Sequence, residues 1–230
     1  MQYEKCAELF ARNGLPISPE VYEKLQAYAE LLLAEAENQN VTALKTDEEI
    51  WTRHFLDSAF LLKYIPAGKG IDLGTGGGIP AIPLAVMNPA LEISMLDSEL
   101  RKIEFCRSVI AKLDIHAETY CGRAEELGRS ALRNQFDFVV SRAMANGSWL
   151  CEFGIPMLRT GGRLFAMKGR QFDPEAERFD SAAAALGAVT ANTIRYELEG
   201  EPKHLIIMEK QSETPAQYPR RFAKMKRAPL

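Results

Sequence analysis

The sequence predicts an α/β fold with a doubly wound, mostly parallel sheet and helices on both of its faces. After Pro66, short apolar runs alternate with helix-like stretches, which is typical of parallel strands joined by helices. A glycine-rich run, 74–78, follows the first apolar run. Two late apolar runs flank Glu199-Gly200-Glu201-Pro202, which indicates an antiparallel hairpin that closes the sheet. In such a sheet, ligands bind beyond the carboxyl ends of the strands.

Residues 1–65 are expected to form a helical extension packed on the core. Apolar residues recur at helical spacing over 21–33, and Ser18 stands just before that stretch, where its hydroxyl can serve as an N-cap. Thr46 and Glu49 have the spacing of a capping box, which predicts the start of a second helix.

The sheet is expected to span 66–212, and 213–230 is then a basic C-terminal tail. Five apolar runs indicate strands at 70–73, 92–97, 117–121, 136–141 and 163–168, with helices beginning near Ile79, Ser98, Ala124 and Asn146. The closing hairpin is expected from 189–198 and 204–209.

The composition indicates a globular protein of a reducing compartment. Hydrophobic residues make up 47% of the 230 residues and charged residues 26%, which are ordinary globular values. No apolar run is long enough to cross a bilayer, and the first residues do not resemble a signal peptide, so a cytoplasmic protein is expected. The four cysteines and three histidines are scattered, so no metal site is expected.

An acid and a glycine run predict a ligand site after the first strand. Asp72 precedes four glycines in the five positions 74–78, and glycines let the backbone approach a ligand closely. A G-x-G-x-x-G dinucleotide fingerprint would need glycine where Ile79 stands. An acid also suits the cationic ammonium and sulfonium of S-adenosylmethionine better than a pyrophosphate. The pattern therefore favours S-adenosylmethionine over a dinucleotide, and the P-loop motif is absent.

Three further charged side chains stand at the ends of later strands. Asp97 ends the second strand, where an acid can accept hydrogen bonds from ribose hydroxyls, although a helix N-cap is the alternative. Arg123 and Arg142 follow the third and fourth strands. An arginine at a ligand-facing edge needs an anionic or hydrogen-bonding partner, and a surface salt bridge is the alternative for each.

These motifs together make the chain resemble the bacterial 16S ribosomal RNA guanine-N7 methyltransferases, the GidB or RsmG family. The resemblance runs through nearly the whole chain, and the combination of RH-x-x-DS with a downstream DxGxGxG loop is specific. It rests on Asn40-Val41-Thr42, 53–58, 72–83, 96–98, Arg101-Lys102, 123–126, Phe136-Asp137, 141–143, Lys168-Gly169, 218–221 and Pro229-Leu230. The chain departs from the usual family pattern at 75, 77, 79 and 81, in the order Arg101-Lys102, and at Phe222-Ala223, where Pro-Gly is common.

The resemblance implies a Rossmann-like class I methyltransferase sheet that binds S-adenosylmethionine and methylates N7 of a guanine in 16S rRNA. Its partner would be that rRNA or the assembling small ribosomal subunit, with a monomer expected. The implied cofactor-binding residues are Asp72, Gly74, Gly76, Gly78, Ile79, Asp97, Ala124, Glu125 and Arg142. The positioning candidates are His54, Arg123, Arg142 and Lys168, and the implied RNA-binding residues are Arg53, Arg123, Lys168, Arg220, Arg221, Lys224, Lys226 and Arg227.

Arg53, His54 and Asp57 are spaced so that they can share a helix face. One interpretation is a face that borders the active cleft; the other is a histidine hydrogen-bonded to a carboxylate. Guanine N7 carries a lone pair and no proton, so its methylation needs no general base, and no nucleophile–base pair is evident in the motifs.

The C-terminal tail is strongly basic in a chain whose formal net charge is −3. Its five cations between Arg220 and Arg227 are predicted to contact RNA phosphates and to lie where no core packing requires them. A solvated, disordered terminus is the alternative. Deleting the tail is expected to leave cofactor binding unchanged.

Three other functions stay open at this point. They are a class I methyltransferase for another RNA, a protein or a small molecule; a nicotinamide oxidoreductase; and an RNA-binding module without catalysis.

Overall fold

The computed structural model describes residues 1–36 and 41–230 and is built around one seven-stranded sheet. Asn40, which contributes to the family resemblance, lies outside the described residues. The strand order is β3-β2-β1-β4-β5-β7-β6. The strands are β1 Lys69–Leu73, β2 Glu92–Asp97, β3 Glu118–Cys121, β4 Phe136–Arg142, β5 Leu158–Lys168, β6 Ala188–Leu198 and β7 Glu201–Lys210. Strands β1 to β5 are parallel, and β7 is antiparallel to both β5 and β6, so the predicted sheet and its closing hairpin are confirmed.

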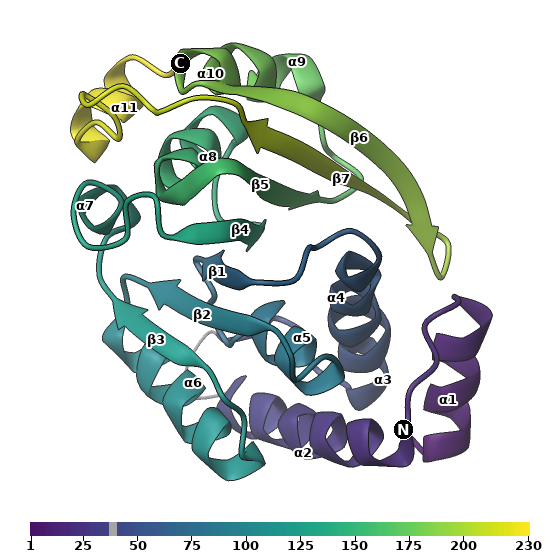
Figure 1. The fold of residues 1–230 in the computed structure, drawn as a ribbon. Helices are drawn as coiled ribbons and strands as arrows, with labels where there is room; N and C mark the ends of the chain where they lie inside the picture. The colour runs from purple at the N-terminus through teal and green to yellow at the C-terminus, as the bar shows by residue number, and fades with distance from the viewer. Residues whose placement is uncertain (37–40) are drawn as a thin grey trace.

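Helices cover both faces of this sheet (Figure 1). One face carries α2 (Pro19–Ala36), α4 (Leu56–Phe60), α5 (Ala81–Met87) and α6 (Leu100–Leu113), and the other carries α8 (Gly147–Gly154) and α10 (Phe179–Ala185). The remaining helical segments are α1 Tyr3–Arg12, α3 Asp47–Ile50, η1 Trp51–Phe55, η2 Leu61–Lys63, α7 Ala124–Leu127, η3 Ile155–Met157, α9 Pro174–Glu177 and α11 Phe222–Arg227.

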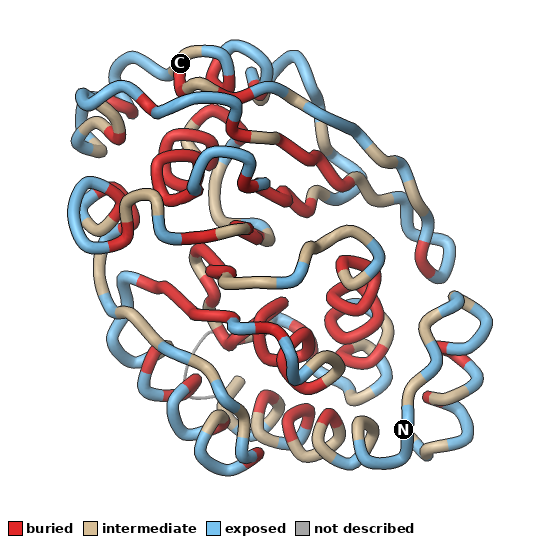
Figure 2. The backbone as a smooth tube through the Cα atoms, viewed as in Figure 1, coloured by how far each residue is buried: buried red, intermediate tan, exposed pale blue. Residues whose placement is uncertain are grey.

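Alternation along the strands divides the core between the two faces, because successive side chains of a strand point to opposite sides. On β4, Phe138 and Val140 join the cluster formed with the N-terminal helices, whereas Val139 joins the cluster under α8 and α10. The central strands are accordingly buried along most of their length (Figure 2). The division of the chain into the parts 1–65, 66–212 and 213–230 stays a prediction.

The predicted helix starts are formed by the expected contacts. The Ser18 hydroxyl accepts a hydrogen bond from the Val21 N–H at 3.2 Å. Thr46 and Glu49 make both halves of the capping box before α3. The next five residues, Trp51–Phe55, continue as a π-helical turn, a distortion that is frequent at functional sites.

Three elements differ from the sequence prediction. Strand β5 begins at Leu158 rather than at 163, because Leu158 already pairs with Phe136 of β4, ahead of a register shift in that pairing. Helices α10 and α11 were not predicted, and both bury apolar side chains, among them Phe179 and Met225.

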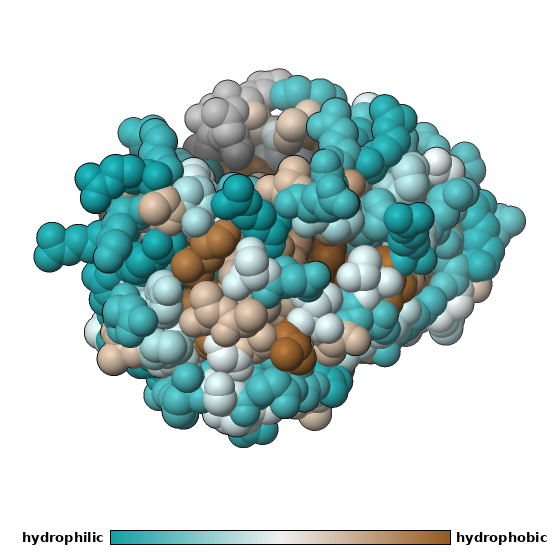
Figure 3. Space-filling model, turned by 90° about the horizontal axis from the view of Figure 1, so that it is seen from above, coloured by the Kyte–Doolittle hydropathy of each residue, from teal (hydrophilic) through white to brown (hydrophobic). Residues whose placement is uncertain are grey.

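The outer surface is mainly polar. Seen from above, hydrophilic side chains surround a few apolar ones in the middle of this face (Figure 3). Among the described residues, no helix has the length and hydropathy that a membrane crossing requires.

Candidate functional site

The glycine-rich run leaves β1 at its carboxyl end and turns across the end of β2. The N–H groups of Gly74 and Thr75 both donate to the Leu96 carbonyl, at 2.9 and 3.0 Å. The Gly76 N–H donates to Oδ2 of Asp97 at 3.0 Å. Gly76 has a φ of +57°, and the nearest atom to a Cβ placed there would be the Gly74 carbonyl oxygen at 4.0 Å. The loop is therefore fixed to β2 with an open side at Gly76.

A cavity of about 380 Å³, which we call the loop cavity, opens at this side. Its volume is typical of a small-molecule site. It is lined by Gly74, Gly76, Leu96, Asp97, Ser98, Lys102, Gly122, Arg123, Ala124, Glu125, Ala143, Met144, Ala145, Trp149, Phe153 and Phe222. Five of the residues predicted to bind a cofactor are thus brought together, namely Gly74, Gly76, Asp97, Ala124 and Glu125.

Four other predicted cofactor residues do not line this cavity. A Cβ on Gly78 would lie 2.3 Å from the Ile82 side chain, so this glycine permits close packing beneath the loop. Ile79 is buried in the core cluster of the N-terminal helices. Asp72 is fully buried below the loop, and Arg142 is directed to His54.

Asp97 supports the loop while its side chain borders the loop cavity. Its Oδ1 accepts from the Glu99 N–H at 3.0 Å, and its Oδ2 accepts from Gly76. The N-cap position of α6 is Glu99, which makes no side-chain cap bond. Asp97 therefore ties the end of β2 to the glycine loop, and carboxylate lone pairs are left for a ligand hydroxyl, because each oxygen can accept more than one hydrogen bond.

Asp72 is a buried acid with too few partners. Its Oδ2 accepts from the Thr75 hydroxyl at 2.7 Å, whereas its Oδ1 has no hydrogen-bond partner among the described residues. Burial raises the pKa of Asp72 to about 7, because a low-dielectric environment disfavours the charged form. The region beneath the loop is thus short of positive charge.

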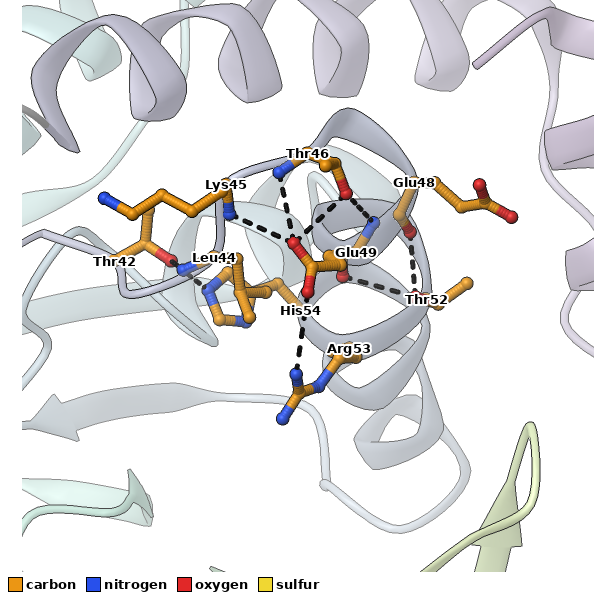
Figure 4. A network of polar contacts seen from close by, with 9 residues as sticks. All are labelled: Thr42, Leu44, Lys45, Thr46, Glu48, Glu49, Thr52, Arg53 and His54. Atoms are coloured by element: carbon orange, nitrogen blue, oxygen red, sulfur yellow. Dashed lines mark hydrogen bonds and ion pairs between the residues drawn. The ribbon is translucent and has the colours of Figure 1, made fainter.

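His54 lies in the second part of the site, where it is buried and held from both ring nitrogens. Arg142 Nη2 lies 2.9 Å from Nδ1, and Thr42 Oγ1 lies 2.8 Å from Nε2 (Figure 4 shows the contact with Thr42). A guanidinium has only donors, so Nδ1 accepts and the hydrogen is on Nε2. Burial and the Arg142 charge lower the pKa of His54 to about 3. The ring is therefore neutral near pH 7, with its lone pair already engaged.

Asp57 neutralises the cations around this histidine. It is buried and accepts from the Tyr196 hydroxyl at 2.9 Å and from Lys203 Nζ at 3.0 Å. Arg142 Nη1 lies 3.8 Å from Asp57 Oδ2. The interpretation of His54 as a histidine bonded directly to a carboxylate is wrong, because Arg142 stands between His54 and Asp57.

A second cavity of about 220 Å³, which we call the basic cavity, is lined by Asp57, Arg142, Ala143, Met167, Lys168, Gly169 and Lys203. Ala143 also lines the loop cavity, so the two cavities share this residue in their walls. Lys168 and Gly169 continue into an open groove of about 640 Å³ that Arg53 and Arg170 also line. Glu177 and Glu201 line the same groove, so its cations stand beside acidic side chains.

Two residues predicted to bind RNA have unexpected surroundings here. The Arg53 side chain is 59% exposed and lies 3.9 Å from Glu49 (Figure 4). The prediction that Arg53 shares a helix face with His54 and Asp57 is therefore wrong, because those two side chains are buried. Lys168 Nζ donates to the Ala145 carbonyl at 2.8 Å and lies 2.6 Å from Glu177. Lys168 is therefore already paired within the protein.

The basic tail packs on the sheet domain, which corrects the expectation that no packing requires its cations. Arg220 binds the fully buried Glu152. Met225 is also fully buried, and Phe222 lines the loop cavity. Arg221, Lys224, Lys226 and Arg227 are exposed. Of the five cations, Arg220 thus has a structural role.

The apolar wall of the loop cavity was not predicted from the sequence. Met144, Trp149, Phe153 and Phe222 all line it. Trp149 and Phe153 are four residues apart on α8, and this spacing could have indicated a shared face. The sequence around Phe222 did not predict its position at the cavity, because that position depends on how the C-terminal tail packs against the rest of the chain.

Comparison with known proteins identifies close relatives. The model of the family GidB, rRNA small subunit methyltransferase G, matches residues 21–205. The ribosomal RNA small subunit methyltransferase G of Moorella thermoacetica is 38% identical, covering 95% of this chain and 94% of that protein. The protein of the same name from Deinococcus radiodurans is 41% identical, covering 90% and 85%.

Solved structures resemble the fold at low sequence identity. TrmN from Thermus thermophilus has a TM-score of 0.52 at 17% identity, covering 70% of this chain and 53% of that one. A geranyl diphosphate methyltransferase in complex with SAM has a TM-score of 0.53 at 13% identity, covering 68% and 85%. These two likenesses bear on the fold alone.

Proposed function

The chain belongs to the rRNA small subunit methyltransferase G family, and we propose that it transfers a methyl group from S-adenosylmethionine to N7 of a guanine in 16S rRNA. The observation that favours N7 as the target atom is that His54 cannot act as a base. Its lone pair is occupied by Arg142 and the pKa of the ring is about 3. The site therefore offers no histidine base, and N7, which carries no proton, needs none.

The residues of the loop cavity fit S-adenosylmethionine. Gly76 presents an open backbone position, Asp97 offers acceptors for ribose hydroxyls, and three aromatic side chains form an apolar part of the wall. The unpaired Oδ1 of Asp72 lies below the same loop, where a cationic ligand end would reduce the cost of its charge. When bound, this cofactor supplies an electrophilic methyl group on a sulfonium.

The protein's own residues would act by holding the two reactants in line. Methyl transfer needs the target nitrogen, the methyl carbon and the sulfur aligned, with competing water removed. Ala143 lines both the loop cavity and the basic cavity, so a base bound in the basic cavity would lie on the other side of this residue from a cofactor in the loop cavity. Arg142 and Lys203 line the basic cavity and are suited to bind the base edge or a phosphate.

A direct test uses purified protein, rRNA that lacks the modification and isotope-labelled S-adenosylmethionine. We expect label in 16S rRNA, recovered as 7-methylguanosine by nucleoside mass spectrometry. A Gly76→Val variant serves as the control for cofactor-dependent transfer. Label in another methylated nucleoside would contradict N7, and label only in protein or small molecules would contradict the RNA substrate.

We propose that the RNA contacts include the exposed cations of the groove and the tail. Arg53 lies at the groove, and Arg221, Lys224, Lys226 and Arg227 lie on the tail, all exposed. Their partner would be naked 16S rRNA or the assembling small subunit, in the cytoplasm. Replacing Lys224, Lys226 and Arg227 with alanine should reduce the slope of log affinity against log salt by about 0.7–0.9 for each lost phosphate contact. An unchanged slope would remove these tail residues from the interface.

A further inference from the structure

The C-terminal segment is anchored to the sheet domain by two arginines. Arg220 donates to the buried Glu152 from its backbone N–H at 2.7 Å, from Nε at 2.7 Å and from Nη2 at 2.6 Å. Arg133 donates to the carbonyls of Thr214 and Tyr218, at 2.6 and 2.7 Å. Charge-assisted bonds of this kind are the stronger ones in proteins. The start of α11 is therefore held in a fixed place.

This anchoring puts one aromatic ring at the loop cavity. Phe222, two residues after Arg220, packs edge-on against Trp149, with ring centroids 5.2 Å apart at 78°. It also lies 6.3 Å from the Phe153 ring, and the Arg123 guanidinium carbon lies 5.7 Å from its centroid. Phe222 is half-buried and lines the cavity, so part of it is open to a ligand.

The lining of the loop cavity has two chemically different parts. Its polar part includes the loop backbone at Gly74 and Gly76 and the Asp97 carboxylate, which suit the amino-acid and ribose parts of a ligand. Trp149, Phe153 and Phe222 are its aromatic residues among the part of the chain that the structure describes. The flat, apolar part of S-adenosylmethionine is its adenine, and aromatic faces bind bases by stacking.

We propose that Phe222 is a cofactor-binding residue, and that the C-terminal segment completes the adenine end of the loop cavity. This inference rests on the proposed cofactor site. It assigns the tail a second role beside RNA contact, because the same short helix carries Phe222 and the exposed Lys224, Lys226 and Arg227. It also reverses the expectation that cofactor binding is independent of the tail.

The test is calorimetric titration of the full-length protein with two ligands, S-adenosylmethionine and 5′-methylthioadenosine, which keeps the adenine and ribose but lacks the amino-acid end. Phe222→Ala should weaken both ligands about tenfold, in line with the loss of one base–aromatic contact. Phe222→Tyr keeps the flat face and should restore both affinities to within about twofold. Ala223→Ser, on an exposed position of the same helix, is the matched control and should leave both affinities unchanged.

The outcomes separate this inference from the cofactor site itself. Asp97→Ala is measured alongside, with thermal unfolding to show that each variant is folded. If Asp97→Ala weakens binding and Phe222→Ala does not, the cofactor site stands and the role of Phe222 is wrong. If Phe222→Ala weakens S-adenosylmethionine but not 5′-methylthioadenosine, its contact is not with the adenine end. If the wild-type protein binds neither ligand, the proposed cofactor site fails, and this inference fails with it.

Discussion

Two buried aspartates stand on either side of the site, and their charges are balanced in opposite ways. Asp57, at the basic cavity, accepts hydrogen bonds from Tyr196 and Lys203 and has Arg142 nearby. Asp72, below the glycine loop, accepts hydrogen bonds at Oδ2 from the Thr75 hydroxyl and the Ala81 N–H, and its Oδ1 has no partner among the described residues. Both side chains are almost fully buried, so the difference lies in their partners and not in their exposure.

The difference indicates which charges the protein supplies and which it leaves to a ligand. At the basic cavity, the cations already have an internal counter-ion, so the protein alone can keep the region ordered. At the loop, Asp72 is buried and forms no ion pair with any residue that the structure describes, so its ionised form is costly unless a positive group binds nearby. A sulfonium and an ammonium are the positive groups of the proposed cofactor. We infer that the charge of Asp72, below the glycine loop, is stabilised when the cofactor binds. The charges around the basic cavity are already balanced in the folded protein.

The largest expected effect is that of removing the internal counter-ion. Asp57→Ala leaves Lys203 and Arg142 without their buried partner, and breaking a buried pair from one side costs about 3–5 kcal/mol. We expect that loss in the free energy of unfolding in urea, with cofactor affinity unchanged. Glu199→Ala breaks the more exposed pair with Arg12 and should cost no more than about 1 kcal/mol. An equal loss in both variants would contradict the special role of Asp57.

The next effect should appear in binding rather than in folding. Gly76→Val places a side chain at the open side of the loop and forces a β-branched residue to a φ of +57°. We expect cofactor affinity to fall more than about 100-fold, or about 2.7 kcal/mol. Gly161→Val is the matched control, since Gly161 also has a positive φ with no atom within 4 Å of a Cβ but lies outside the cavity. If both variants bind equally well, the loop is not the cofactor site.

A smaller effect should reveal the unbalanced charge of Asp72. The folded pKa of about 7 lies above the unfolded value of about 3.9. Its contribution to stability is therefore full below about pH 4 and is lost as the pH rises through 7. Between pH 5 and 8, the wild type should lose about 2.6 kcal/mol of unfolding free energy relative to Asp72→Asn, at about 1.4 kcal/mol for each pH unit below the folded pKa.

Urea unfolding of both proteins at the two pH values measures this difference, and all other titrating groups cancel in the comparison. Saturating S-adenosylmethionine should reduce this pH-dependent difference in unfolding free energy, because a nearby cation favours the ionised carboxyl. A pH-independent difference would mean that Asp72 does not titrate in this range.

The sequence predicted those residues of the loop cavity that directly follow a strand along the chain. The glycine loop, Asp97 and the Ala124-Glu125 pair follow strands whose alternation and length are visible in the sequence, and parallel strands bring their ends to one edge. The capping box at Thr46 was also local, and it is present.

The rest depended on contacts between distant residues. His54 and Arg142 are 88 positions apart, and Arg220 and Glu152 are 68 apart. The pattern of charges alone could not show that Arg142 contacts His54 instead of the cofactor loop. Phe222 lies at a position where the family commonly has a different residue pair, so neither periodicity nor resemblance predicted an aromatic wall.

The smallest expected effect is the pH dependence of the chemical step. His54, with a pKa of about 3 and its Nδ1 bonded to Arg142, stays neutral from pH 6.5 to 8.5, and N7 has no proton to lose. In single-turnover assays with RNA and cofactor saturating, the rate should change less than about twofold over this range, since no catalytic base titrates there. Saturation matters because Asp72 titrates near 7 and can change cofactor affinity. A tenfold rise per pH unit would show a required deprotonation and would place a catalytic base in the basic cavity, where the structure has a neutralised cluster.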